Sequence, residues 1–112
     1  MKNANIEQNE GMKSIQVTYT TRKDIERKIE FFGKWIVEGI CDEPDDYSGD
    51  YSVALTLKGK LLVLVENNYA EYGYHKVFEG FEEFSKDDLV PADVVAKVAL
   101  ELGIDYVEFL DI

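Results

Sequence analysis

Apolar and polar residues alternate along much of the first two thirds of the chain, which is the pattern of half-buried β-strands. Ile15, Val17 and Tyr19 face one way in the first such segment, and polar residues stand between them. Residues 61–65 are apolar at every position, which predicts a central strand that is covered on both faces. A Lys-Gly pair at 58–59 joins this strand to the one before it, because glycine tolerates the positive φ of a tight hairpin turn.

Residues 21–41 fit two different elements. One set of apolar residues has helical spacing behind a Thr-x-x-Asp capping box, and another set alternates as in a strand. The helical set is Ile25, Ile29, Phe32, Ile36 and Ile40, and the alternating set is Ile29, Phe31, Trp35 and Val37. Gly33 and Gly39 would each destabilise a helix by about 1 kcal/mol, and β-branched and aromatic residues favour a strand. We therefore predict a short capped turn at 21–27 followed by a strand, and keep a helix as the alternative.

The last third of the chain predicts a helix at 90–103. Pro91 suits its first turn, Asp93 favours the positive end of the helix dipole, and Gly103 stands where a C-cap belongs. The apolar stripe of this helix is Val94, Val95, Val98 and Leu102. Before it we expect a further strand and one helical turn, in the segments YHKVFEGF and FEEFS. After it we expect the tail, irregular or as a strand, to pack back on the core through Ile104, Tyr106, Leu110 and Ile112.

Together these elements predict a single α+β domain at 12–112, in which a curved antiparallel sheet of about four to six strands carries a C-terminal α-helix on one face. A chain of 112 residues with 46% apolar residues has enough apolar side chains for one core. Residues 1–11 are polar and unpatterned, so we predict a disordered leader there, with Met12 as a candidate start.

Acidic residues outnumber basic ones by 23 to 12, which gives a formal net charge of -11. The excess follows residue 34: residues 1–34 carry seven basic and five acidic residues, whereas residues 35–112 carry five and eighteen. Such a surface repels phosphate, so we expect no direct binding to nucleic acid and an attraction for a basic protein partner. The sequence shows no bilayer-length apolar run and no signal-peptide pattern, and the lone Cys41 excludes an internal disulfide. We therefore expect a cytoplasmic protein that binds no membrane.

The final residues EFLDI, 108–112, match the pattern that gives the bacterial EXLDI protein family its name. Three upstream segments resemble segments of that family in the same order, namely RKIEFFGKWIVEG, YSVALTLKGKLLVLVEN and HKVFEGFEEF, and the Pro-led helix follows them. The resemblance covers about residues 27–112. It implies no established activity, so no catalytic residue is carried over from the family.

Longer members of the EXLDI family resemble ribbon-helix-helix DNA-binding proteins at their N-termini, which implies transcriptional regulators with an appended C-terminal domain. Such DNA readers need a strand and two helices in each subunit. Residues 12–28 provide a strand and at most one short helix, so this chain resembles the appended domain alone. We therefore do not expect Gln16, Thr18 or Arg22 to read DNA, and we expect a role accessory to bacterial regulation.

The segment CDEPDDYSGDY at 41–51 contains five carboxylates, which are Asp42, Glu43, Asp45, Asp46 and Asp50. Oxygen ligands suit a hard cation such as calcium, but the spacing departs from the EF-hand pattern and Pro44 interrupts it. A solvated loop between two strands, with aspartate and glycine in the turn, is the plainer interpretation. We predict no metal site.

The remaining polar residues form no recognisable catalytic pattern. His75 is the only histidine, and the sequence identifies no oriented partner that would make it a general base. The acids that follow Cys41 disfavour a thiolate, and no serine lies in a G-x-S-x-G context. The paired acids Glu82/Glu83 and Asp87/Asp88 suit a helix end and solvent. We predict no catalytic residue, no cofactor and no enzyme activity.

Two functions of different classes remain. The first is a protein-interaction or assembly module, because one helix covers only one face of the sheet and leaves apolar residues for a dimer or another partner. The apolar partner-binding residues would be Phe32, Ile36, Leu62 and Leu64. The alternative is a nucleic-acid mimic of phage or mobile-element origin that inhibits a DNA-handling, restriction or CRISPR protein through the acidic residues at 42–50. Its binding would be steeply salt-sensitive and would be lost when Asp45, Asp46 and Asp50 become asparagine.

Overall fold

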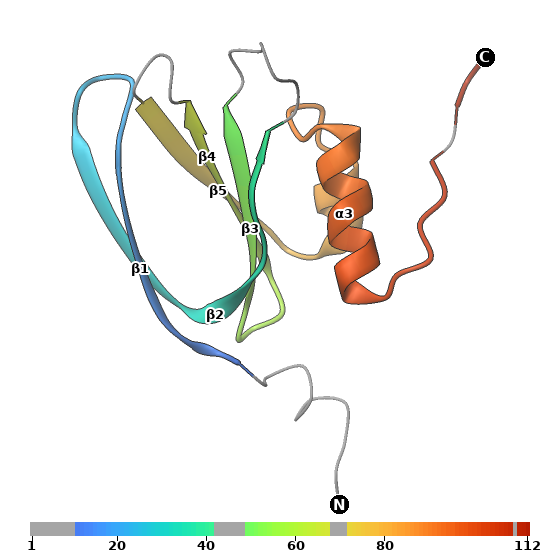
Figure 1. Ribbon diagram of the computed structural model, residues 1–112, viewed down its shortest axis with the longest axis horizontal. Helices are drawn as coiled ribbons and strands as arrows, with labels where there is room; N and C mark the ends of the chain where they lie inside the picture. Colours follow the sequence, from blue (N-terminus) through green and yellow to red (C-terminus); the bar gives the residue numbers. More distant parts are fainter. Residues whose placement is uncertain (1–10, 42–48, 68–71, 109) are drawn as a thin grey trace, which may run out of the picture.

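The computed structural model describes residues 11–41, 49–67, 72–108 and 110–112. These ranges contain five strands and two helices, which are β1 (Lys13–Thr20), β2 (Glu26–Cys41), β3 (Asp50–Thr56), β4 (Leu61–Asn67), β5 (Tyr72–Phe78), α2 (Phe81–Ser85) and α3 (Ala92–Leu102). Each strand pairs antiparallel with the next one along the chain. The sheet is curled and carries α3 on one face (Figure 1), which confirms the predicted α+β class. The predicted leader lies outside the described residues, apart from Gly11.

The region 21–41 is a turn followed by a strand, and the helix alternative is wrong. Thr21 closes the turn, because its N–H donates to the Ile25 carbonyl at 2.8 Å and its hydroxyl accepts from the Ile25 N–H at 3.2 Å. The strand β2 then pairs with β1 along its first half and with β3 along its second half. Each half of β2 therefore forms inter-strand hydrogen bonds with one partner strand in place of helical ones.

The strand β2 bends strongly in its middle, and the bend shapes the whole sheet (Figure 1). Its register against β3 shifts between Trp35 and Val37 and again between Val37 and Ile40, which marks β-bulges. Gly33 stands just before the first shift, at a point where a Cβ atom would lie 2.5 Å from the Leu55 carbonyl oxygen. The missing side chain therefore lets two backbones approach closely at the bend.

The strand β1, the turn after it and the first half of β2 form a hairpin arm, residues 13–32. The arm curls over the face of the sheet opposite α3 (Figure 1). Beneath it lies a small buried cluster of Tyr19, Leu62 and Leu64, against which Val17, Ile29, Phe31 and Trp35 pack half-buried. The central strand β4 is thus covered on both faces, as its apolar sequence predicts.

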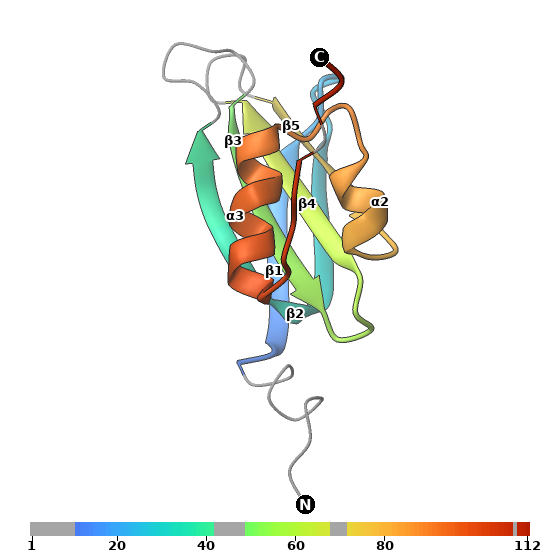
Figure 2. The same ribbon diagram turned by 90° about the vertical axis from the view of Figure 1, so that its right-hand side faces the viewer.

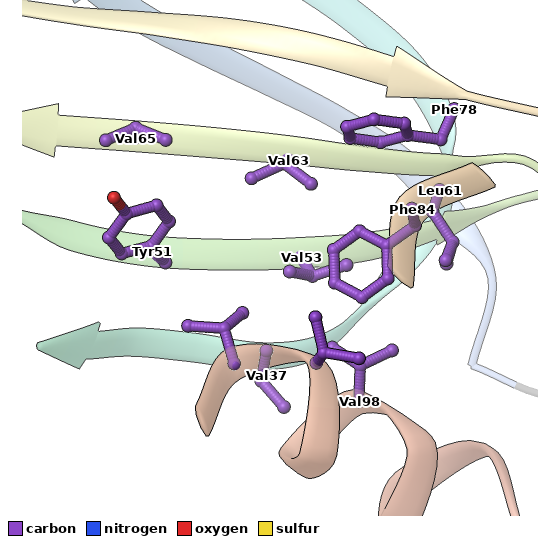
Figure 3. Close-up of a cluster of buried hydrophobic side chains, with 11 residues drawn as sticks. Val37, Tyr51, Val53, Leu61, Val63, Val65, Phe78, Phe84 and Val98 are labelled. Atoms are coloured by element: carbon purple, nitrogen blue, oxygen red, sulfur yellow. The ribbon is translucent and has the colours of Figure 1, made fainter. Parts of the chain in front are cut away.

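The main core lies between the sheet and the two helices (Figure 3). The helix α3 contributes Val94, Val95 and Val98, three residues of the predicted stripe, and all three are buried. The short helix α2 contributes Phe84, whose ring meets that of Phe78 edge-on with the centroids 5.6 Å apart. Neither helix in the described ranges is long and apolar enough to cross a membrane.

The ends of α3 lie close to their predicted positions. Pro91 is the N-cap residue in an extended conformation, one position before the first turn in which it was expected. Gly103 caps the C-terminus with a φ of 72°, the left-handed conformation that glycine adopts without strain. The chain therefore stops being helical where the sequence indicates.

The tail after α3 leaves the core, contrary to the sequence-based expectation. It runs back along the outer side of the helical layer (Figure 1, Figure 2), and its described residues form no strand. Tyr106 packs as predicted, with its ring centroid 5.6 Å from that of Phe81. Ile104, Leu110 and Ile112 are exposed instead. The buried valines of α3 already occupy the part of the sheet beneath the helix, and the tail runs outside that helix.

Candidate functional site

The acidic residues predicted to bind a partner lie mostly outside the described residues. This holds for Asp42, Glu43, Asp45 and Asp46. Asp50 is described, and it begins β3 opposite Cys41 of β2 and Glu66 of β4. Within the described ranges, no three histidine, cysteine, aspartate or glutamate side chains come together in a way that could hold a metal ion.

The four residues predicted to form an apolar partner-binding face do not share a surface. Leu62 and Leu64 are only 5% and 4% exposed beneath the hairpin arm, so the prediction that they face a partner is wrong. Ile36 packs against the core on the helix side, and Phe32 is 48% exposed at the end of the arm. The bend in β2 explains the error, because it turns the arm onto the face that one helix leaves uncovered.

A tyrosine and a histidine join the hairpin arm to β5. The Tyr19 hydroxyl oxygen lies 2.7 Å from His75 Nδ1, so His75 is a hydrogen-bonded residue of the strand β5. The guanidinium carbon of Arg27 lies 5.9 Å from the centre of the Tyr19 ring. Burial lowers the pKa of His75, and the positive charge of Arg27 lowers it further. A neutral imidazole with an unprotonated Nδ1 accepts the hydrogen bond of the tyrosine hydroxyl.

The lowered pKa of His75 predicts a fold that loses stability in mild acid. The ordinary histidine pKa is 6.5, and the unfolded chain takes up the proton there. The stabilisation is therefore complete above that pH and is lost as the pH falls through 6.5 toward the lower pKa of the folded chain. We expect the urea midpoint to fall more steeply from about pH 7 to about pH 5 in the wild-type chain than in His75→Asn, whose amide can keep the contact with Tyr19. Equal slopes would contradict this role of His75.

A second link joins the turn of the hairpin arm to β5. An Arg22 Nη atom donates to the Tyr72 hydroxyl at 2.6 Å, and the guanidinium carbon lies 4.7 Å from the centre of the Tyr72 ring. The hydrogen bond from Arg22 is the main reason why the pKa of Tyr72 is lowered, and a hydrogen bond from Asn67 adds to it. Sequence reasoning missed both links, because their partners stand 56 and 50 residues apart and no local pattern pairs them.

The paired acids near α2 make structural contacts. Asp87 accepts a hydrogen bond from Lys76 Nζ at 2.6 Å, and this bond lowers the pKa of Asp87. The Glu83 carboxylate accepts from the Glu79 N–H at 3.2 Å. Both contacts hold the chain around α2 in place.

Exposed apolar side chains recur along residues 100–112, which we call the C-terminal segment. After the end of α3, this segment runs along the outer side of the helix (Figure 2). Leu100, Val107 and Leu110 are 70%, 80% and 61% exposed, and Ile112 is fully exposed. The sequence of this segment contains four acidic residues and no basic one. It therefore combines exposed apolar side chains with a negative charge.

Charge is distributed unequally between the two sides of the sheet. Residues 79–112, which include both helices and the C-terminal segment, carry ten acidic and two basic residues. The hairpin arm on the opposite side (Figure 1) carries three acidic and five basic residues. The helical side is thus strongly negative, and the arm is weakly positive.

No protein-family model, curated protein or solved structure matches this chain. The resemblance to the EXLDI family therefore rests on the order of its sequence motifs.

Proposed function

We propose that this chain is a non-enzymatic protein-interaction module that binds a basic partner protein through its C-terminal segment. The exposure of Leu100, Val107 and Leu110 in the free chain is the observation that carries this proposal. Burying one such side chain in a partner contributes about 1.5–3 kcal/mol to the complex. The part of the segment that follows Gly103 lies outside the helix, so its backbone can also add to the edge of a partner's sheet.

The charge of the C-terminal segment favours a basic partner. Its carboxylates alternate with the apolar residues, at Glu101, Asp105, Glu108 and Asp111. Together with the other acids of residues 79–112, they create a negative field that attracts a basic surface and repels phosphate. Added salt screens this field. Salt should therefore slow the association of the two proteins more than it weakens the apolar contact between them.

Replacing Val107 and Leu110 together with serine is expected to abolish partner binding and to leave the fold intact. Both side chains are exposed, so the free energy of unfolding should change by less than about 0.5 kcal/mol. A photo-crosslinking amino acid at position 105 provides the measurement. In cells that naturally make the chain, the cross-linked product should form with the otherwise unchanged sequence and disappear in the double variant.

Leu57→Ser is the matched control, because Leu57 is also an exposed apolar residue but lies outside the C-terminal segment. This variant should keep the cross-linked product. If the double variant cross-links as strongly as Leu57→Ser, the C-terminal segment is not the binding surface. Sedimentation at micromolar concentration identifies the partner as a second copy if the mass doubles from 12.8 kDa.

A nucleic-acid mimic is the second candidate, and the unequal distribution of charge favours it. Residues 79–112 place ten acidic residues on the helical side of the molecule, and duplex DNA carries one negative charge about every 1.7 Å of its axis. A mimic would bind in the cleft of its partner protein that otherwise binds DNA. In an extract of the same cells, added duplex DNA would then reduce the cross-linked product. It would leave the product unchanged if the partner is bound through apolar contacts away from its DNA site.

We also propose that this chain acts in the bacterial cytoplasm as an accessory to regulation, and that it belongs to the EXLDI family. The sequence motifs between residues 27 and 112 follow one another in the same order as in that family, which supports this assignment. The genes beside the coding sequence test it. A neighbouring regulator or transporter gene would support the accessory role, and a prophage defence island would support the mimic.

A further inference from the structure

A row of side chains crosses three strands on the face of the sheet that carries α3. Tyr51 of β3 stands opposite Val65 of β4, and Val65 stands opposite Tyr74 of β5. Figure 3 shows Tyr51 and Val65 on neighbouring strands, at the end of the main core away from Phe84. Together with Leu89, from the connection between α2 and α3, this row lines a surface pocket of about 310 Å³. The pocket therefore has an apolar floor.

The next cross-strand pair gives the same pocket a polar end. Asn67 of β4 stands opposite Tyr72 of β5, and Arg22 donates its hydrogen bond to the Tyr72 hydroxyl there. In the described part of the chain, no carboxylate lies within ion-pair distance of Arg22, although acidic residues outnumber basic ones by 23 to 12. A guanidinium has five N–H donors, so Arg22 can hold Tyr72 and still bind a carboxylate.

We propose that this pocket binds a carboxylic acid with a flat or branched apolar body. The carboxylate accepts hydrogen bonds from Arg22, and the apolar body lies on the row formed by Tyr51, Val65 and Tyr74. The volume of about 310 Å³ suits a body of the size of a phenyl ring. The pocket uses no residue of the C-terminal segment, so this proposal does not depend on the proposed function.

The charges around the pocket favour a negatively charged ligand and determine how it is oriented in the pocket. Burial raises the pKa of Tyr74 at the far end of the row, and the negative charge of Asp87 raises it more than the positive charge of Lys76 lowers it. An anionic group is therefore disfavoured at that end. A neighbouring pocket of about 260 Å³ shares Asn67 and Tyr72, but its described lining contains Glu66 and no basic residue. The same acid should therefore bind beside Arg22 and avoid the neighbouring pocket.

Phenylacetate is the probe, because it carries a carboxylate on a phenyl body. The titration is followed by NMR of the chain labelled with 13C at its tyrosines. Phenylacetate should shift the signals of Tyr51, Tyr72 and Tyr74 to saturation, with a dissociation constant in the millimolar range or below. Phenethylamine has the same body with a positive charge, and acetate lacks the body. Both should bind at least about tenfold more weakly. Equal binding of phenethylamine, or no saturation with phenylacetate, would overturn the proposal.

Arg22→Gln should weaken phenylacetate binding at least about tenfold. Lys23→Gln changes the same turn at a residue outside the pocket lining, so it should bind phenylacetate as the wild-type chain does. Arg22 also holds the hairpin arm, so its substitution also removes a contact of the fold. A second readout therefore uses the wild-type chain, in which this contact is intact. A bound carboxylate offsets the charge of Arg22, so the pKa of Tyr72 should rise on saturation. An unchanged Tyr72 pKa would refute the proposed contact.

Acetyl-Gly-Phe distinguishes two sources of the same chemistry. Binding at least about tenfold tighter than that of phenylacetate would assign the carboxylate to the end of a peptide chain. Binding that falls short of this tenfold gain would assign it to a free acid. Both outcomes support the carboxylate site at Arg22 and decide what fills it.

Discussion

Replacing Gly33 with alanine is expected to lower the free energy of unfolding by about 3 kcal/mol, at the upper end of the usual effect of overpacking. A Cβ atom at this position would lie 2.5 Å from the Leu55 carbonyl oxygen and 3.1 Å from the Thr56 Cα. Both are backbone atoms, so no side chain can rotate away to relieve the clash. The bend in β2 would have to open, and the hairpin arm would separate from Leu62 and Leu64. Urea unfolding measures the loss.

Gly39→Ala is the matched control, in the same strand. Gly39 has a φ of +64°, but a Cβ atom there meets nothing within 4 Å. Its substitution should therefore lower stability only through the left-handed backbone, by about 1 kcal/mol. Equal losses for the two variants would show that close approach at Gly33 does not hold the bend.

Phe84→Ala is expected to lower the free energy of unfolding by about 3–5 kcal/mol. The Phe84 side chain is fully buried, and its ring lies 5.6 Å from that of Phe78 and 5.9 Å from that of Phe81. The helix α2 is only five residues long and has no side-chain cap, so it depends on this contact for its position. Loss of Phe84 should also release Tyr106, which rests on Phe81.

Phe32→Ala gives the comparison for Phe84→Ala, since it removes the same ring from an exposed site on β2. We expect it to lower the free energy of unfolding by less than about 1 kcal/mol. Denaturant unfolding with matched buffers measures both variants. A loss at Phe84 no larger than the loss at Phe32 would mean that α2 is not anchored through this ring.

The elements that can be predicted from the sequence are those whose signal is local. The hairpin of β3 and β4 follows from two apolar runs around a Lys-Gly turn, and α3 follows from a valine stripe that ends at Gly103. The strand β2 is ambiguous because Ile29 belongs to both periodic patterns. Pairing with β1 and β3, which one strand sequence does not encode, decides between them.

The candidate sites were harder to predict, because they depend on contacts between distant segments. Leu62 and Leu64 look available for a partner until the hairpin arm is seen to cover them. Arg22 and Tyr72 lie 50 residues apart, and each is unremarkable in its own sequence context. The exposure of the C-terminal segment cannot be predicted from its own residues either, because the same apolar residues would suit a tail packed on the core.

Neighbouring strands in this sheet are also neighbours along the chain. The loops that must close to build the sheet are therefore short, and short closures lose little chain entropy. Topologies of this kind reach the native state faster than those built from distant pairings. The contact between Tyr19 and His75 spans 56 residues and is an exception. The arm should therefore dock late in folding and detach early in unfolding, after the rest of the sheet has formed and before it is lost.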